Sequence, residues 1–302
     1  MRPQEALRDL DRAYVNWWRS HKRGRRVGRP RFKNKGRCPE RFRLTGAIRM
    51  EQDAVVLPRI GRVRTKEATG KFCGRILSAT CRREADRWYV ALTVEVARPD
   101  PVTVTGPVVG VDRGIRTFAV CSDGTRIDSP RALTRGLRRL RRRGRAVTRT
   151  QPGSANRRRA VLALARYHRR IRNQRVDALH KATTALANAK SVIVVEDLHV
   201  AGMVRNRQLA RAIADQGWAE FHRQLAYKTA WYGSRLFAPR FYPSSKTCSN
   251  CGLLKTTLPP EMRLFSCTGC GLMTDRDLHA ARNLARLAGA DAERVAASSA
   301  ET

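Results

Sequence analysis

The sequence predicts an α/β protein with a small cysteine-rich insertion, and three observations support this prediction. Two apolar runs, 107–115 and 191–198, have the character of buried strands and contain acidic residues toward their ends. Between them, residues 131–189 favour two long helices separated by a turn at 150–155. Four cysteines in two CxxC pairs come later in the chain. Because a strand-rich region at 42–96 precedes these elements, we expect more than one domain in 302 residues.

The net charge is the most unusual property of the chain. It contains 62 Lys and Arg against 25 Asp and Glu, which gives a formal net charge of +37 at pH 7. A compact fold with this excess repels itself unless a polyanion lies beside it, and phosphate backbones are the obvious polyanion. No stretch approaches the ~18 apolar residues of a membrane span, and no signal peptide is visible. We therefore expect a nucleic-acid-binding protein of the cytoplasm, associated with the nucleoid and without a membrane partner.

The N-terminal third is predicted to contain a helix, a basic loop and a small barrel. Residues 6–20 show the apolar stripe of an amphipathic helix, and 21–43 form a loop rich in Lys, Arg and Gly. From 42 to 96, short apolar segments alternate with turns, a pattern typical of a small β-barrel. Pro and Gly residues at 100–107 predict a domain boundary.

The strand at 107–115 contains Asp112, and a hairpin meander is predicted to continue from it to residue 128. Burying a lone carboxylate costs free energy unless it is paired or binds a metal, so Asp112 is a candidate ligand. The strand at 191–198 contains Glu196 and Asp197. Strand side chains alternate between faces, so only one of these two acids can join Asp112.

The segments after this second strand are predicted to lead the chain to the cysteines. A flexible segment at 201–203 precedes a helix with Trp218, Phe221 and Leu225 on one face. A further strand is expected at 235–240.

The segment from Arg131 to Arg175 contains 17 Arg and no acidic residue. These side chains cannot be neutralised by i,i+4 ion pairs, so they must face phosphates or solvent. Arg suits phosphate because its planar guanidinium donates in a fork. The candidate phosphate-binding residues are Arg138, Arg139, Arg141, Arg142, Arg169 and Arg170.

The two CxxC pairs have the spacing of a zinc ribbon, in which four thiolates hold one structural Zn²⁺. The alternatives are disulfides or buried thiols, which the lack of a secretion signal disfavours. Cys38, Cys73, Cys81 and Cys121 have no such spacing and are interpreted as core or incidental thiols. The predicted zinc ligands are Cys248, Cys251, Cys267 and Cys270.

Two acidic residues, Asp275 and Asp277, open a predicted helix at 278–287 that follows the ribbon. Either carboxylate could simply cap the helix, since acids at a helix start accept hydrogen bonds from free amides and complement the dipole. Only partners elsewhere in the chain could make one of them a catalytic ligand.

Three pieces of this sequence, in this order, resemble one family. They are GVDRGI with Asp112, VIVVEDL with Glu196, and DRDLHAARN after the four-cysteine ribbon. The family is TnpB (OrfB-type), insertion-sequence proteins related to the type V CRISPR effectors and often described as transposases; PRFK, the GW…F…L helix and SSKTCSNCG extend the resemblance. It implies a helical recognition segment and basic loop at 1–41, a β-barrel wedge domain at 42–100, a RuvC-like nuclease core of RNase H fold at 101–243, the zinc ribbon at 244–272, and a final RuvC helix and tail at 273–302.

Carried over residue by residue, the resemblance implies that Asp112, Glu196 and Asp277 are the catalytic carboxylates. Three such carboxylates converging from two strands and a helix start can hold two Mg²⁺ ions for phosphodiester hydrolysis. Asp277, rather than Asp275, matches the third catalytic carboxylate of the family, because it shortly precedes a position that is usually Asn in the family. That position is occupied by His279 in this sequence. Arg276 could hold the scissile phosphate or could be a solvated surface residue.

The resemblance implies an RNA-guided DNA endonuclease. Its guide RNA would come from the transposon end and pair with the target DNA, and the protein would read a short adjacent motif. Two alternatives remain open: a catalytically idle nucleic-acid-binding relic, and a transposase that joins DNA ends. Family members usually carry a further N-terminal barrel strand and more recognition helices, so we expect these to be missing here. The oligomeric state is not predicted.

Overall fold

The computed structural model describes residues 4–25, 27–31, 38, 40–70, 74–240, 242–259 and 262–300, and the side chains up to residue 288. Cys73 and the Phe-Lys end of the PRFK motif lie outside the described residues. The chain forms two compact units, one of residues 1–99 with 161–166 and one of residues 100–160 with 167–302. Each unit is described separately. The five-part domain division expected from the family stays a prediction.

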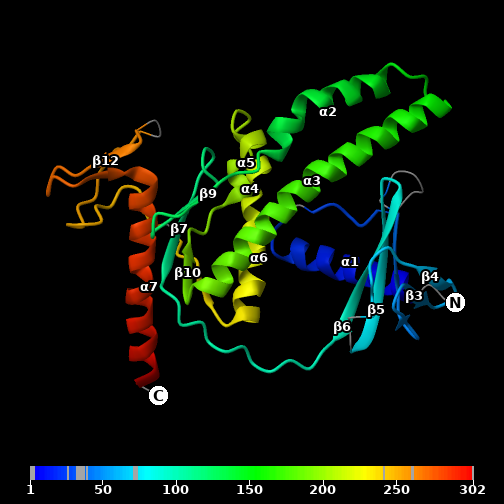
Figure 1. Ribbon diagram of the computed structural model, residues 1–302, viewed down its shortest axis with the longest axis horizontal. Coiled ribbons are helices and arrows are strands. Elements are labelled where there is room, and N and C mark those ends of the chain that lie inside the picture. Colours follow the sequence, from blue (N-terminus) through cyan, green and yellow to red (C-terminus); the bar gives the residue numbers. More distant parts are fainter. Residues whose placement is uncertain are drawn as a thin grey trace. The chain divides into compact units, whose positions relative to one another are not determined.

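The first unit begins with helix α1 (Gln4–Lys22), which confirms the predicted N-terminal helix. Its strands form two antiparallel sheets (Figure 1). One sheet has the order β1-β5-β6 and contains β1 (Arg41–Leu44), β5 (Arg75–Glu84) and β6 (Arg87–Glu95). The other has the order β2-β3-β4 and contains β2 (Arg49–Met50), β3 (Ala54–Leu57) and β4 (Gly61–Arg64).

The predicted closed barrel is not confirmed for this unit. Among the described residues, the hydrogen-bonded ladders stay within each three-stranded sheet. The two sheets nevertheless share one core, because Val55 and Leu57 of β3 pack with Ala79 and Cys81 of β5. The alternation of apolar and polar residues predicted the strands, whereas the pairing between them depends on residues far apart in sequence.

The second unit contains a five-stranded sheet of order β11-β10-β7-β8-β9. Its strands are β7 (Val109–Arg113), β8 (Ala119–Cys121), β9 (Arg126–Ile127), β10 (Val192–Val195) and β11 (Arg235–Phe237). The pairs β7–β8 and β8–β9 are antiparallel, which confirms the predicted meander, and β10 lies parallel to both β7 and β11. Long helices lie between the parallel strands in sequence, so the predicted α/β class is confirmed.

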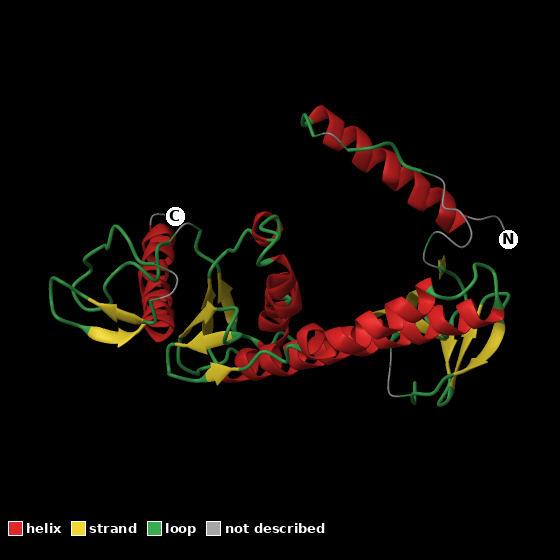
Figure 2. Ribbon diagram, turned by 90° about the horizontal axis from the view of Figure 1, so that it is seen from above, coloured by secondary structure: helices red, strands yellow, loops and turns green. Residues whose placement is uncertain are grey.

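Helices cover both faces of this sheet (Figures 1 and 2). On one face lies α7 (Arg276–Ala300), where Leu284 and Ala288 pack against Val194. On the other face, Val109, Val111, Ile193 and Val195 pack against residues of α3 (Ala155–Ala189), α5 (Ala210–Gln216) and α6 (Trp218–Tyr232). The predicted apolar face of the Trp218 helix is therefore the core-facing one.

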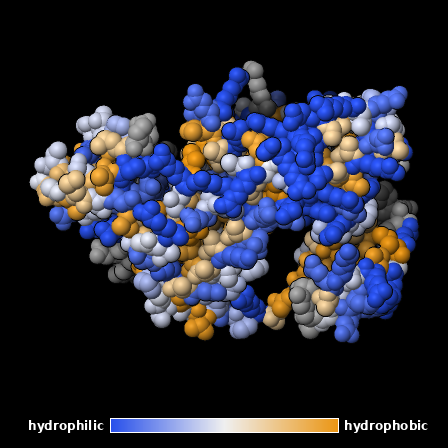
Figure 3. Space-filling view, turned by 45° about the horizontal axis from the view of Figure 1, so that its top comes forward, coloured by the Kyte–Doolittle hydropathy of each residue, from blue (hydrophilic) through white to orange (hydrophobic). Residues whose placement is uncertain are grey.

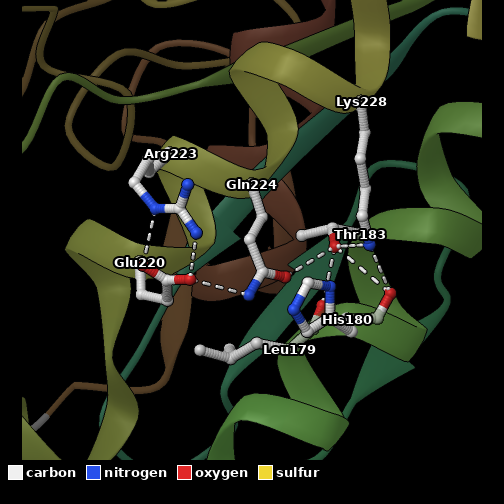
Figure 4. Close-up of polar contacts among 7 residues, drawn as sticks. All are labelled: Leu179, His180, Thr183, Glu220, Arg223, Gln224 and Lys228. Carbon is white, nitrogen blue, oxygen red and sulfur yellow. Dashed lines mark hydrogen bonds and ion pairs between the residues drawn. The ribbon is translucent and has the colours of Figure 1, made fainter. Parts of the chain in front are cut away.

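A buried polar network fixes α6 against α3 (Figure 4). Lys228 donates to the backbone oxygen of His180 at 2.7 Å and to the hydroxyl of Thr183 at 2.8 Å. The Thr183 hydroxyl donates to Oε1 of Gln224 at 3.0 Å, and Nε2 of Gln224 donates to Glu220 at 3.0 Å. Because each buried polar group finds a partner, this contact between two helices avoids the desolvation penalty of an unpaired one.

The turn predicted at 150–155 separates α2 (Ala132–Thr148) from α3. The segment predicted to be flexible at 201–203 is instead part of a one-turn helix, α4 (Val200–Met203). Its turn is closed by backbone hydrogen bonds from Met203 to His199 and from Val204 to Val200, both 3.1 Å. The small residues suggested flexibility, but local hydrogen bonding organises them.

The ribbon is a small hairpin of β12 (Leu264–Ser266) and β13 (Met273–Asp275) that leads directly into α7. Its own core is Phe265 with Cys248 and Cys267. No helix within the described residues has the length and apolar character needed to cross a membrane. Hydrophilic side chains dominate the visible face of the molecule, with apolar ones in small groups between them (Figure 3).

Candidate active site and metal centre

Asp112 and Glu196 lie at the ends of neighbouring parallel strands. Val111 pairs with Val195, so the two acids occupy adjacent positions one residue further along β7 and just beyond β10. Val194 packs against α7, and Glu196 is two residues beyond it, so its side chain faces α7 as well. Asp197 faces away and forms an ion pair with Arg240 at 2.8 Å. Glu196 is therefore the acid that joins Asp112.

Asp277 approaches the same point from the first turn of α7. This helix lies so close to β7 that a Cβ built on Gly110 would be 1.9 Å from the backbone oxygen of Ala281, one turn after Asp277. Burial raises the pKa of Asp112 to about 7, and the negative charges of Glu196 and Asp277 contribute to the increase. Glu196 and Asp277 thus both lie within electrostatic range of Asp112.

Asp275 has the ordinary role of a helix cap. Its Oδ1 accepts a hydrogen bond from the backbone N–H of Leu278 at 2.9 Å, and its Oδ2 lies 3.2 Å from Nη2 of Arg126. Capping, which the sequence allowed for either acid, is thus performed by Asp275. Asp277 does not share this role; its Oδ2 lies 3.5 Å from Nη1 of Arg263, and its Oδ1 lies 3.7 Å from Nε of Arg276.

Arg276 lies beside this cluster. Its Nε is 3.7 Å from Oδ1 of Asp277, and its side chain is only 20% exposed. Its positive charge lowers the pKa of Asp112 and so opposes the effect of burial. Its Nη1 also donates to the backbone oxygen of Pro259 at 3.4 Å, in a solvent-exposed contact. The role of Arg276 in holding a phosphate therefore stays a prediction.

Arg113 is a site residue that the sequence reasoning missed. Its guanidinium is buried and donates to the backbone oxygens of Glu196 and Trp218, the latter at 3.5 Å. Burial lowers its pKa to about 10, so it remains charged at neutral pH. Arg113 follows Asp112 on β7 and points to the opposite face of the sheet, from which it holds the end of β10. The sequence feature that could have identified Arg113 is its position directly after Asp112 in a strand predicted to be buried.

The donor set at this cluster fits Mg²⁺, which prefers carboxylate oxygens in proteins. Burial raises the pKa of Asp112, and repulsion from Glu196 and Asp277 adds to this increase. A cation bound between them would relieve this repulsion. The residues that would hold it are Asp112, Glu196 and Asp277.

The four ribbon cysteines form a site suited to zinc. Their sulfur atoms all lie within 4.8 Å of one another, with Cys248 and Cys270 at 3.6 Å and Cys251 and Cys267 at 3.5 Å. A tetrahedral ion with Zn–S bonds of ~2.3 Å would place sulfurs roughly 3.8 Å apart. A disulfide bond is ~2.05 Å long, so these separations correspond to free thiols gathered around one point.

His279, at the position that is usually Asn in the resembling family, connects the ribbon to α7. Its Nε2 accepts a hydrogen bond from the backbone N–H of Ser249 at 2.9 Å, and its ring stacks on Phe265 at 3.8 Å. Burial lowers the pKa of His279 to about 4, so the ring is neutral near pH 7. A polar contact between helix and ribbon is therefore present despite the changed residue.

The predicted phosphate-binding arginines lie on α2 and α3. A groove of about 440 Å³ between these helices is lined by Arg139 and Arg170, together with Arg135. Arg139 also lies over the ring of Tyr167, 5.3 Å from its centroid. Arg169 is half-buried, and the remaining candidates on α2 are exposed to solvent: Arg138, Arg141 and Arg142.

Comparison with known proteins identifies relatives over most of the chain. The OrfB_IS605 family, described as "Probable transposase", matches residues 91–207, and "Cas12f1-like, TNB domain" matches residues 218–284. A "Putative RNA-guided DNA endonuclease" of Streptomyces pristinaespiralis is 35% identical over 287 residues, which cover 93% of this chain and 69% of that protein. This chain belongs to the TnpB (OrfB-type) family.

Two further TnpB relatives carry the same description. One, from Escherichia coli K12, is 31% identical with coverage of 93% of this chain and 72% of the relative. The other, from Mycobacterium tuberculosis H37Rv, is 42% identical with coverage of 91% and 65%. The chain thus spans about two thirds of the length of these TnpB proteins. Among solved structures, a CRISPR-Cas12f ternary complex has a TM-score of 0.48 at 16% identity, covering 86% of this chain and 66% of that one.

Proposed function

We propose that this TnpB-family chain is an RNA-guided DNA endonuclease whose RuvC-like site hydrolyses DNA phosphodiesters. The observation that supports the proposal is that Asp112 and Glu196 follow paired residues of neighbouring parallel strands, and that burial, together with the charges of Glu196 and Asp277, raises the pKa of Asp112 to about 7. The description of three relatives as RNA-guided DNA endonucleases supports the same conclusion.

The proposed RuvC-like core corresponds to the sheet of order β11-β10-β7-β8-β9. An antiparallel meander extended by two parallel strands, with acids at the ends of β7 and β10, is the arrangement expected of an RNase H-like nuclease. The wedge domain is proposed for the two sheets of the first unit, which share one core.

The three carboxylates would hold two Mg²⁺ ions, which would supply an activated water and stabilise the departing 3′ oxygen. The strands hold Asp112 and Glu196 at fixed adjacent positions, and α7 presents Asp277 opposite them. Arg276 balances part of the negative charge and lies where a guanidinium could contact the scissile phosphate. Arg113 restrains the backbone of Glu196 from the other face of the sheet.

The arginines of α2 and α3 are proposed to bind the phosphate backbone of the guide RNA or of its duplex with target DNA. Arg138, Arg141 and Arg142 are exposed, Arg139 and Arg170 line one groove, and residues 131–175 contain no acidic residue. Asp177 also lines the groove, where it forms an ion pair with Lys181 at 2.8 Å. Such contacts carry no base information, so base pairing would supply the sequence specificity.

The test begins with the RNA that copurifies with the protein. This RNA should be sequenced, its guide segment replaced, and the complex incubated with Mg²⁺ and a DNA library that carries the matching target. We expect cleavage next to one short motif. Replacement of Asp112, Glu196 or Asp277 by Ala should abolish cleavage and leave RNA binding unchanged. Asp275→Ala is the matched control, because it removes a cap and no proposed metal ligand.

Each other outcome identifies an alternative function. Tight RNA binding without cleavage would indicate a catalytically idle nucleic-acid binder. Joining of DNA ends in a parallel strand-transfer assay would indicate a transposase. Full cleavage by the Asp277→Ala protein, together with loss in the Asp275→Ala protein, would show that the third carboxylate is assigned wrongly.

A further inference from the structure

Ser244 is a buried serine whose hydroxyl contacts a proposed catalytic carboxylate. It is 2% exposed, and its Oγ donates a hydrogen bond to Oε1 of Glu196. The two residues are 48 positions apart in sequence and come from different parts of the fold, since Ser244 precedes the first zinc knuckle. Neither the family resemblance nor the charge pattern of the sequence gives this serine a role.

The position of Ser244 is set by its own backbone. Its N–H donates to the oxygen of Tyr242 at 2.9 Å, and its carbonyl accepts from Nδ2 of Asn283 at 2.7 Å. The same nitrogen of Asn283 donates to the oxygen of Thr247 at 2.6 Å. Asn283 is 2% exposed and lies on α7, the helix that carries Asp277. One buried amide therefore ties the segment 244–247 to the helix that completes the acidic cluster.

The same face of α7 also holds the beginning of the ribbon. Ser249, which follows the zinc ligand Cys248, donates its N–H to His279 and accepts a hydrogen bond from Arg286 through its oxygen. His279, Asn283 and Arg286 lie at successive turns of one helix, so they form a continuous polar contact with residues 244–249. The hydroxyl of Ser244 lies at the end of this contact, where it meets Glu196.

We propose that Ser244 is a positioning residue for the proposed nuclease reaction: its hydroxyl orients the Glu196 carboxylate for the metal, and Asn283 holds the serine in place. The inference rests on the proposed function. A hydroxyl that donates to Oε1 fixes the plane of the carboxylate and leaves Oε2 directed to a cation. Groups that orient metal ligands from outside typically change metal affinity or activity by about 10–100-fold when they are removed.

The test compares Ser244→Ala with Ser245→Ala, the neighbouring serine, and with Glu196→Gln as the reference for a lost ligand. All are purified as complexes with the same RNA, and Mg²⁺ binding is measured by thermal unfolding across a Mg²⁺ titration. The Mg²⁺-dependent stabilisation of the Glu196→Gln complex is subtracted from that of the other complexes, because it reports the Mg²⁺ that the RNA binds. Cleavage is then measured over the same Mg²⁺ range, and zinc content and metal-free melting temperature are recorded for each protein.

We expect Ser244→Ala to raise the Mg²⁺ concentration required for half-maximal stabilisation and cleavage by about tenfold or more. Zinc content, RNA affinity and metal-free melting temperature should match those of Ser245→Ala. Ser244→Cys, which keeps a weak donor, should be intermediate. A purely structural serine would lower the melting temperature without moving the Mg²⁺ requirement, and that result would overturn the proposal.

Different results would refute the role of Ser244 and the nuclease activity. If the wild-type complex cleaves and Glu196→Gln does not, while Ser244→Ala retains the wild-type Mg²⁺ requirement, the role of Ser244 is refuted and the proposed function stands. If the wild-type complex neither binds Mg²⁺ beyond the Glu196→Gln reference nor cleaves, both are refuted.

Discussion

Replacing Gly110 by Ala tests whether the close contact between β7 and α7 builds the active site. A Cβ at this position would lie 1.9 Å from the oxygen of Ala281, 2.5 Å from the nitrogen of Ala285 and 2.9 Å from Cβ of Leu284. Two of these three atoms belong to the helix backbone, so no side-chain rotation can remove the clash. Restoring an ordinary contact of 3.4 Å to the oxygen requires α7 to retreat by about 1.5 Å.

This displacement has consequences for both stability and catalysis. Overpacking a core typically costs about 1–3 kcal/mol, and a clash with backbone belongs at the upper end, so we expect a loss of about 3 kcal/mol. In a unit of this size such a loss lowers the melting temperature by about 6–12 °C. Asp277 lies one turn from Ala281 and would move away from Asp112, and a misplacement of ~1 Å can reduce a rate about 100-fold.

Gly144→Ala is the matched control for this experiment. Gly144 lies within α2, and a Cβ there would meet no atom within 4 Å, so Ala should stabilise the helix by about 0.5–1 kcal/mol. Denaturant unfolding, thermal unfolding and Mg²⁺-dependent cleavage are measured for both proteins. If Gly110→Ala unfolds within about 0.5 kcal/mol of the wild type and cleaves at the wild-type rate, the reasoning is wrong.

Three further predictions follow from the fold. Zinc removal should unfold the ribbon and reduce cleavage, since structural zinc supplies roughly 10–16 kcal/mol in isolated fingers; zinc-free protein with full activity would contradict this. Asp215 accepts hydrogen bonds from the N–H groups of Leu133 and Thr134, both at 2.9 Å, so Asp215→Ala should destabilise the start of α2 by about 2 kcal/mol and weaken RNA binding. Both quantities are measured against the exposed Asp100→Ala protein. Because its pKa is raised to about 7, the carboxylate of Asp112 gains a proton as the pH falls through that value, and the proton competes with Mg²⁺. The Mg²⁺ concentration required for half-maximal cleavage should therefore increase about tenfold from pH 8 to pH 6. An unchanged requirement would refute this.

Local patterns determined the elements and most of the predicted residues. The apolar runs at 107–115 and 191–198 became neighbouring strands, and both long helices formed with the turn between them. These features depend on side-chain periodicity and on turn residues, which act over a few positions and are therefore visible in a sequence. The CxxC spacing predicted the sulfur cluster for the same reason, since each pair forms one tight knuckle.

Only the tertiary structure decided which residues meet across long separations. Local rules treated Asp275 and Asp277 alike, and the contacts of Asp275 with Leu278 and Arg126 separated them. Arg131, at the start of α2, makes no side-chain capping hydrogen bond. Asp215, 81 positions from Thr134, caps this helix instead. Ser244 likewise gains its partner only when the chain folds.

The strands of the first unit show the same limit, because a strand-rich region at 42–96 was predicted while its division into two sheets was not. In each case the missing information is a pairing between distant segments. Its free energy depends on the final packing of both partners and on the entropy of closing the loop between them, and neither quantity is encoded in the pattern of any single segment.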